Sequence, residues 1–141
     1  MNGDGERLAR HYFDLLNGRP IEEATQILAE GFVFHHPPLT PDEGWIGREV
    51  FLERALRLTR SAFPDMRFEI DDLLADDRRA AVRWTMHASH RGPYLGIPAS
   101  GRVVRVSGCN FFRVEGGQII VTWVVRDTLG LLQQIGGEVP G

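Results

Sequence analysis

The chain of 141 residues carries a formal net charge of −3, with 43% hydrophobic and 25% charged residues, which is typical of one globular domain over 1–141. The acidic balance argues against a surface for nucleic acid or anionic membrane, and no apolar run approaches the roughly 20 residues that cross a bilayer. Cys109 is the single cysteine and the N-terminal segment is polar, so we expect no internal disulfide, no signal segment and a cytoplasmic location.

The N-terminal third is predicted to form two helices and a short strand. Apolar residues recur at helical spacing over 6–17, and a second helical pattern follows a proline over 21–29. The aromatic segment 32–36 is predicted to be a strand, because two prolines stop it.

The rest of the chain is predicted to form a third helix, a sheet and a short final helix. Apolar periodicity places these helices over 48–62 and 128–135. Alternation and turn signals predict four antiparallel strands, at about 66–70, 80–90, 103–114 and 118–126. Helices segregated from a meandering sheet indicate an α+β fold. We expect a cone, in which a strongly bent, mostly antiparallel sheet packs on the N-terminal helices and encloses a pocket with its other face.

Five segments of the sequence carry a resemblance to a known family. In chain order they are HYFDLLNGRP, FVFHHPP, AFPDMRFEIDDLLADDRRAAVRW, SHRGPYLGIPASGR and FFRVEGGQIIVTWVVRDTLGLLQQIG. In this order and spacing they are similar to the SnoaL-like polyketide cyclases (ester cyclases) of the nuclear-transport-factor-2-like (cystatin-like) superfamily, over nearly the whole chain.

The resemblance implies a homodimer of cone-shaped subunits, each with a deep apolar pocket. Cyclases of the family close a ring of an anthracycline antibiotic precursor by an intramolecular aldol reaction, without cofactor or metal and with an Asp as acid/base. Close relatives hydroxylate, and distant ones isomerise or dehydrate, so the fold by itself does not fix the reaction.

Asp127 is the first catalytic candidate. Period-two alternation puts it on one face of the last strand with Ile119, Val121, Trp123 and Val125. A carboxylate at the end of an apolar face is partly desolvated, which raises its pKa toward the range useful for proton transfer. Asp127 also precedes a predicted helix, where an N-capping Asp would have a lowered pKa. The pattern leaves both interpretations open, whereas the resemblance implies catalysis, since the family's catalytic Asp falls at this position.

His35 and His36 are neighbours on a strand, so only one of them faces the pocket. His36 shares its face with Phe32 and Phe34, and the resemblance aligns it with a pocket-lining Asn. We therefore expect His36 in the pocket as a second catalytic candidate, with a solvent-facing strand end as the alternative.

Asn110 is the third catalytic candidate, in the strand that flanks the last one. Its amide can donate to an enolate oxygen but cannot carry protons at neutral pH. The family pattern has a Gln and a His where Gly108 and Asn110 stand. This departure leaves the specific ring closure open.

Seven side chains are expected to bind substrate: Tyr12, His35, Trp45, Trp84, His90, Phe112 and Trp123. Each has a structural alternative. A tyrosine among leucines is often core with its hydroxyl at the edge, and His90 could hold the Gly/Pro-rich loop that follows it. The tryptophans would form an apolar wall that suits a flat substrate or ordinary packing.

The sequence has no metal-ligand spacing, nucleophile elbow or nucleotide motif. We therefore predict a cofactor-independent enzyme without metal that acts on an apolar, carbonyl-bearing, polyketide-like molecule. Asp127 would remove a proton next to a carbonyl, and Asn110 with His36, His90 or Tyr12 would hold the enolate. Aldol cyclisation, isomerisation or dehydration (lyase or isomerase chemistry) would follow. The alternatives are a non-catalytic small-molecule-binding domain and a hydroxylase.

Overall fold

The computed structural model describes residues 3–136, and the ends of the predicted domain, 1–2 and 137–141, lie outside the described residues. The helical elements are α1 (Gly3–Leu16), η1 (Ile21–Glu23), α2 (Ala24–Ile27), α3 (Arg48–Phe51), η2 (Leu52–Arg57), α4 (Leu58–Ala62) and α5 (Thr128–Gln134). The strands are β1 (Leu28–His35), β2 (Trp45–Ile46), β3 (Arg67–Ala75), β4 (Arg79–Ser89), β5 (Val103–Glu115) and β6 (Gln118–Arg126).

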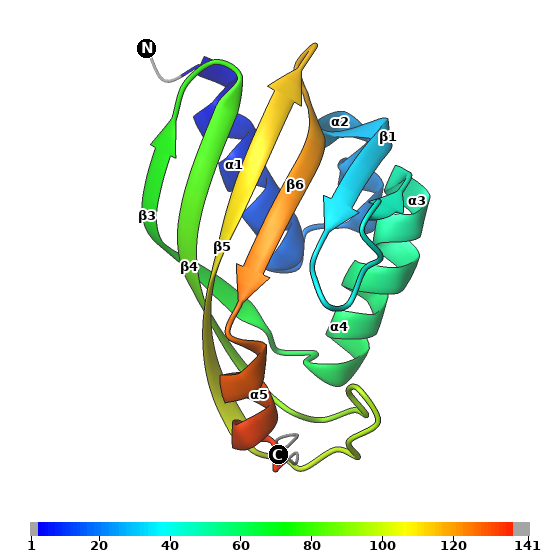
Figure 1. Ribbon diagram of the computed structural model, residues 1–141. Coiled ribbons are helices and arrows are strands. Elements are labelled where there is room, and N and C mark those ends of the chain that lie inside the picture. The colour runs from blue at the N-terminus through cyan, green and yellow to red at the C-terminus, as the bar shows by residue number, and fades with distance from the viewer. Residues whose placement is uncertain (1–2, 137–141) are drawn as a thin grey trace.

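All six strands form one bent sheet in the order β2-β1-β6-β5-β4-β3. The long strands β3 to β6 are an antiparallel meander, and β1 joins β6 in parallel. Helix α1 and the helix made of α3, η2 and α4 pack on one side of the sheet, which Figure 1 shows from the opposite side. This arrangement confirms the predicted α+β cone.

The third predicted helix is continuous over 48–62, as the periodicity indicates, but its middle segment η2 is a π-helix. The second predicted helix, over 21–29, is shorter than expected and ends at Ile27. Strand pairing ends it, because Leu28 is already extended and lies opposite Ile119 of β6. The side-chain amide of Gln118 also donates to the Leu28 carbonyl oxygen, at 3.3 Å.

A bulge in β6 decides which side chains face the core. Val114 pairs with Ile119 but Arg113 pairs with Val121, so Ile120 is an extra residue in β6. One extra residue moves every following side chain to the opposite face. The predicted face of the last strand is therefore wrong beyond Ile119: Trp123 and Val125 point outward, whereas the residues facing the core are Thr122, Val124 and Arg126.

Helix α5 lies against the end of β5 that extends past β6. The side chain of Gln134 pairs with the backbone of Arg105 in both directions, accepting from its N–H at 2.8 Å and donating to its carbonyl at 2.9 Å. An amide side chain thus takes the place of a strand neighbour, which fixes α5 on this edge. None of the helices in the described part of the chain has the length and apolar character needed to span a membrane.

Candidate active site

A pocket opens between the sheet and the helices, and holds about 520 Å³ of space including its mouth. The expectation that the pocket lies on the sheet face away from the helices is wrong, because the sheet curls toward them. The lining residues are Tyr12, Leu16, Phe34, His36, Phe51, Ala55, Leu56, Thr59, Met66, Phe68, Trp84, Met86, Asn110, Val124 and Arg126.

His36 lines the pocket just beyond the end of β1. Its backbone N–H donates to Thr40 Oγ1 at 2.9 Å and its carbonyl accepts from the Thr40 N–H at 3.1 Å, so the turn that follows holds it in place. The side chain is 5% exposed and lies beside the Phe34 ring. This is the orientation that strand alternation predicts for the two histidines.

The imidazole of His36 is neutral at physiological pH. Burial, and after it the positive charge of Arg126, lowers its pKa to about 4. Backbone carbonyls at the strand end raise the pKa slightly, but Nδ1 makes no hydrogen bond of ordinary geometry and is buried. The pocket therefore contains a neutral imidazole with an unoccupied ring nitrogen.

Asn110 is held by a chain of hydrogen bonds across three strands. The Trp84 indole donates to its Oδ1 at 2.8 Å, and its Nδ2 donates to Thr122 Oγ1 at 3.0 Å. The Thr122 hydroxyl donates in turn to the Phe111 carbonyl at 2.9 Å. Because an indole N–H can only donate, these contacts fix the orientation of the amide.

Tyr12 places a hydroxyl group beside Asn110 from α1. Its ring is buried and meets Phe13 and Phe112 edge-on, with centroids 5.2 and 5.0 Å away. Burial raises the pKa of the Tyr12 hydroxyl, and the hydrogen bond with Asn110 offsets part of this rise. The hydroxyl stays protonated and is available as a donor in the pocket.

Arg126, the last residue of β6, is a pocket residue that the sequence prediction missed. Its Nε and Nη2 are buried without a hydrogen-bond partner, and its Cζ lies 5.6 Å from the centre of the Tyr94 ring. A signal was present in the sequence, since the apolar run 119–121 breaks the alternation of the strand, as a bulge does.

Asp127 does not line the pocket. Its side chain is exposed and its Oδ1 accepts from the Gly130 N–H at 2.9 Å, as the N-cap of α5, while its own N–H donates to the Ser107 carbonyl. The predicted position on an apolar inner face is wrong, because the bulge in β6 turns Arg126 inward and Asp127 outward. Whether Asp127 carries protons stays a prediction.

Three of the expected substrate-binding residues lie outside the pocket lining, on β1, β2 and β6. The His35 ring stacks on Trp123 on the outer face of the sheet, with ring centroids 5.5 Å apart and an interplanar angle of 5°. His35 points outward because side chains alternate along β1, and Trp123 points outward because the bulge in β6 reverses the direction of the residues after it. Trp45 stacks behind Phe34, with centroids 6.0 Å apart, and so supports the pocket wall from outside.

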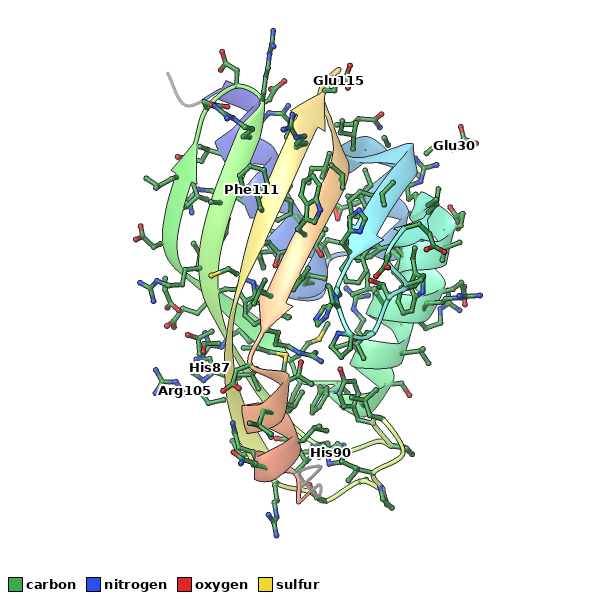
Figure 2. The ribbon with its side chains drawn as sticks, in the orientation of Figure 1. Glu30, His87, His90, Arg105, Phe111 and Glu115 are labelled. Carbon is green, nitrogen blue, oxygen red and sulfur yellow. The ribbon has the colours of Figure 1, made fainter. Side chains whose placement is uncertain are left out.

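His90 and Phe112 also lie outside the lining. His90 is completely buried, and its Nδ1 accepts a hydrogen bond from the Ser100 N–H at 3.1 Å and lies 2.9 Å from Ser100 Oγ. Figure 2 shows it at the lower end of the molecule, beside the loop that follows β4. Phe112 is packed in the core against Tyr12 and Phe13.

Tyr12, His36, Trp84 and Asn110 are thus the predicted site residues that the fold brings together. No Asp or Glu stands among the lining residues, and over residues 3–136 no three His, Cys, Asp or Glu side chains gather as a metal site would require. An α+β cone with one apolar pocket and a few convergent polar groups defines a small-molecule site.

Residues 6–135 match the family model of the SnoaL-like polyketide cyclases, and the chain belongs to this family. The chain is also similar to several solved structures. TsrD from Streptomyces laurentii is 30% identical, with a TM-score of 0.79 over 94% of this chain and 95% of that one. IdmH from Streptomyces antibioticus, provisionally assigned as a polyketide cyclase, is 25% identical, with a TM-score of 0.81 over 93% and 97%.

A third structure, AclR from Streptomyces galilaeus, is provisionally assigned as a hydroxylase. It is 21% identical, with a TM-score of 0.78 over 96% of this chain and 83% of that one, and this likeness concerns the fold alone. A comparison with curated proteins finds no match. Membership of this family of polyketide cyclases implies that the protein binds a small molecule and suggests enzyme activity.

Proposed function

We propose that the protein is a cofactor-independent acid/base enzyme for an apolar, carbonyl-bearing, polyketide-like molecule, with His36 as the proton carrier. The observation that carries this proposal is the neutral imidazole of His36, whose buried Nδ1 has no partner in a pocket with largely apolar walls. A general base needs a free lone pair at the substrate and a surrounding that excludes bulk water.

In the proposed reaction, His36 Nδ1 takes a proton from the carbon next to a substrate carbonyl. The Tyr12 hydroxyl donates a hydrogen bond to the enolate oxygen that forms, and Asn110 positions Tyr12. If the enolate carbon attacks a second carbonyl, a C–C bond closes a ring and His36 returns the proton to the new alkoxide. If the proton returns to another carbon, the result is isomerisation. If protonated His36 instead gives the proton to a β-hydroxyl, the enolate expels water and the result is dehydration.

Asp127 is a second candidate for the proton carrier, because the resemblance places the family's acid/base at this position. Asp127→Asn separates the two candidates cleanly, since Asn caps a helix about as well as Asp and only the charge is lost. His36→Asn is the matching variant, and puts an amide where the family's pocket-lining Asn stands.

The test measures hydrogen–deuterium exchange at the α-carbon of 2-tetralone in D₂O by NMR. We expect the protein to accelerate exchange over buffer by roughly 10²–10⁴-fold, His36→Asn to abolish the acceleration and Asp127→Asn to retain it. Loss in Asp127→Asn with retention in His36→Asn would transfer the role to Asp127. A wild-type protein that binds 2-tetralone without accelerating exchange contradicts the acid/base function and favours a binding domain. Oxygen consumption during turnover would instead favour a hydroxylase.

We propose, further, that the protein is cytoplasmic and that two copies pair through the outer face of the sheet. Phe111, which Figure 2 labels, is 38% exposed there and Trp123 is 40% exposed, beside the more exposed Val125. An apolar patch of this kind marks an interaction surface. Sedimentation analysis is expected to give a dimer for the wild type and a monomer for Trp123→Glu, and a monomeric wild type would contradict the pairing.

A further inference from the structure

The guanidinium of Arg126 is set apart from the other part-buried arginines of residues 3–136 by its missing partners. Arg48 also has a buried Nε without a hydrogen bond, but its Nη1 donates to the Leu28 carbonyl. Arg60 donates to the carbonyls of Leu15 and Arg19. Arg126 makes no ion pair with any described residue, and its Nε and Nη2 are buried without an acceptor. Buried donors of a charged group are unfavourable without an acceptor, and an anion in contact with Nε and Nη2 would remove this cost.

The two free nitrogens lie on the same edge of the guanidinium. The N–H of Nε and one N–H of Nη2 point in the same direction, and this pair of parallel donors matches the two oxygens of a carboxylate. The Tyr94 ring lies near the guanidinium, 5.6 Å from Cζ, and Arg126 itself lines the pocket. Arg126 therefore carries, on a side chain that lines the pocket, a fork that matches one planar anion, with neighbouring atoms covering both nitrogens in the absence of such an anion.

We propose that Arg126 binds a carboxylate of the substrate through Nε and Nη2, so that the enzyme acts on an aromatic or polyketide acid in its free, anionic form. This inference rests on the proposed function in one respect, namely that the pocket is the substrate site. It differs from the substrate that the family name ester cyclase implies, because an ester has no charge with which to balance Arg126.

The position of His36 gives the carboxylate a second role. The titratable side chains that line the pocket are Tyr12, His36 and Arg126, without any acid among them. In the empty pocket the charge of Arg126 contributes to the low pKa of His36. A carboxylate on Arg126 neutralises this charge, so binding of the acid would make His36 a stronger base than it is with a neutral ligand such as 2-tetralone.

The test compares the binding of 2-naphthoate with that of its methyl ester by isothermal titration calorimetry. The pair shares its ring system, and only the charge differs. A charge-assisted hydrogen-bond pair corresponds to roughly 10- to 100-fold in affinity, so we expect the wild type to prefer the acid by that factor. In Arg126→Met the ratio should fall to about one, with the affinity for the ester retained.

Arg126→Lys and Arg113→Met are the matched controls. The lysine keeps the charge but loses the fork, so it should keep part of the preference, and the exposed Arg113 on β5 should be replaceable without effect. Equal affinity of the wild type for acid and ester overturns the inference, as does an unchanged ratio in Arg126→Met. Binding is measured without turnover, so a failure of the tetralone exchange would contradict the proposed function and leave this comparison valid.

Discussion

Replacing His36 by Asn is expected to remove a pH dependence from the stability of the protein. The unfolded chain has a His36 pKa near 6.5, whereas in the folded protein burial and Arg126 lower it to about 4. As the pH falls below 6.5, the unfolded state gains a proton that the folded state does not accept. Stability is therefore lost as the pH falls from about 6.5 to about 4, and nothing is lost above that window.

The size of this effect follows from the same two values. A difference of 2.5 pKa units corresponds to about 3 kcal/mol. Solvent at the pocket mouth reduces this figure, so we expect about 2–3 kcal/mol. Urea unfolding of wild type and His36→Asn at about pH 7.5 and about pH 4.5 measures it. Titration of the other histidines and carboxylates is common to both proteins, so the difference between them isolates His36.

The wild type should lose about 2 kcal/mol more than His36→Asn between these two pH values, because a pH of about 4.5 lies above the folded-state pKa and the full effect is not yet reached. Parallel losses would refute the reasoning, because they would mean that the imidazole is no more difficult to protonate in the folded pocket than in the unfolded chain. The same outcome would weaken the assignment of His36 as a desolvated base.

Three further outcomes follow from the site. Arg126→Met should stabilise the ligand-free protein by about 1–3 kcal/mol, since it removes two buried donors, Nε and Nη2, that have no acceptor; a lower melting temperature would contradict this. Asp127→Ala should destabilise by about 1 kcal/mol through the lost cap of α5, while Asp127→Asn stays near wild type. Chemical denaturation measures the stability of both variants, and an Asp127→Asn protein no more stable than Asp127→Ala would contradict this. Thr122→Val should destabilise by about 1–3 kcal/mol, because the Asn110 N–H that donates to Thr122 Oγ1 loses its acceptor, and an unchanged unfolding midpoint would show that the network is not needed.

Local patterns were sufficient for much of the fold. The helix over 48–62 and the strands β4, β5 and β6 were predictable because apolar periodicity belongs to each segment by itself. The same holds for the inward direction of His36 on β1 and of Asn110 on β5, where the alternation is regular. The family was also identifiable from short segments in a fixed order, and the match over 6–135 confirms it.

Pairing between distant segments decided the rest. The helix expected over 21–29 ends at Ile27 because Leu28 lies beside Ile119, which is far away in the sequence. The hydrogen bonds that hold Asn110 and Tyr12 together also join strands and a helix that no local pattern relates.

The clearest case is the direction in which the side chains of β6 point. Alternation tells which residues share a face, but which face is buried depends on the register with β5, and Ile120 adds one residue to that register. This single insertion turns Asp127 toward solvent and Arg126 into the pocket. The sequence by itself therefore determined the family, the fold class and four residues of the pocket wall, namely Tyr12, His36, Trp84 and Asn110. The tertiary structure decided which charged side chain at the end of β6 lines the pocket, because the register with β5 sets the direction of every residue after the bulge.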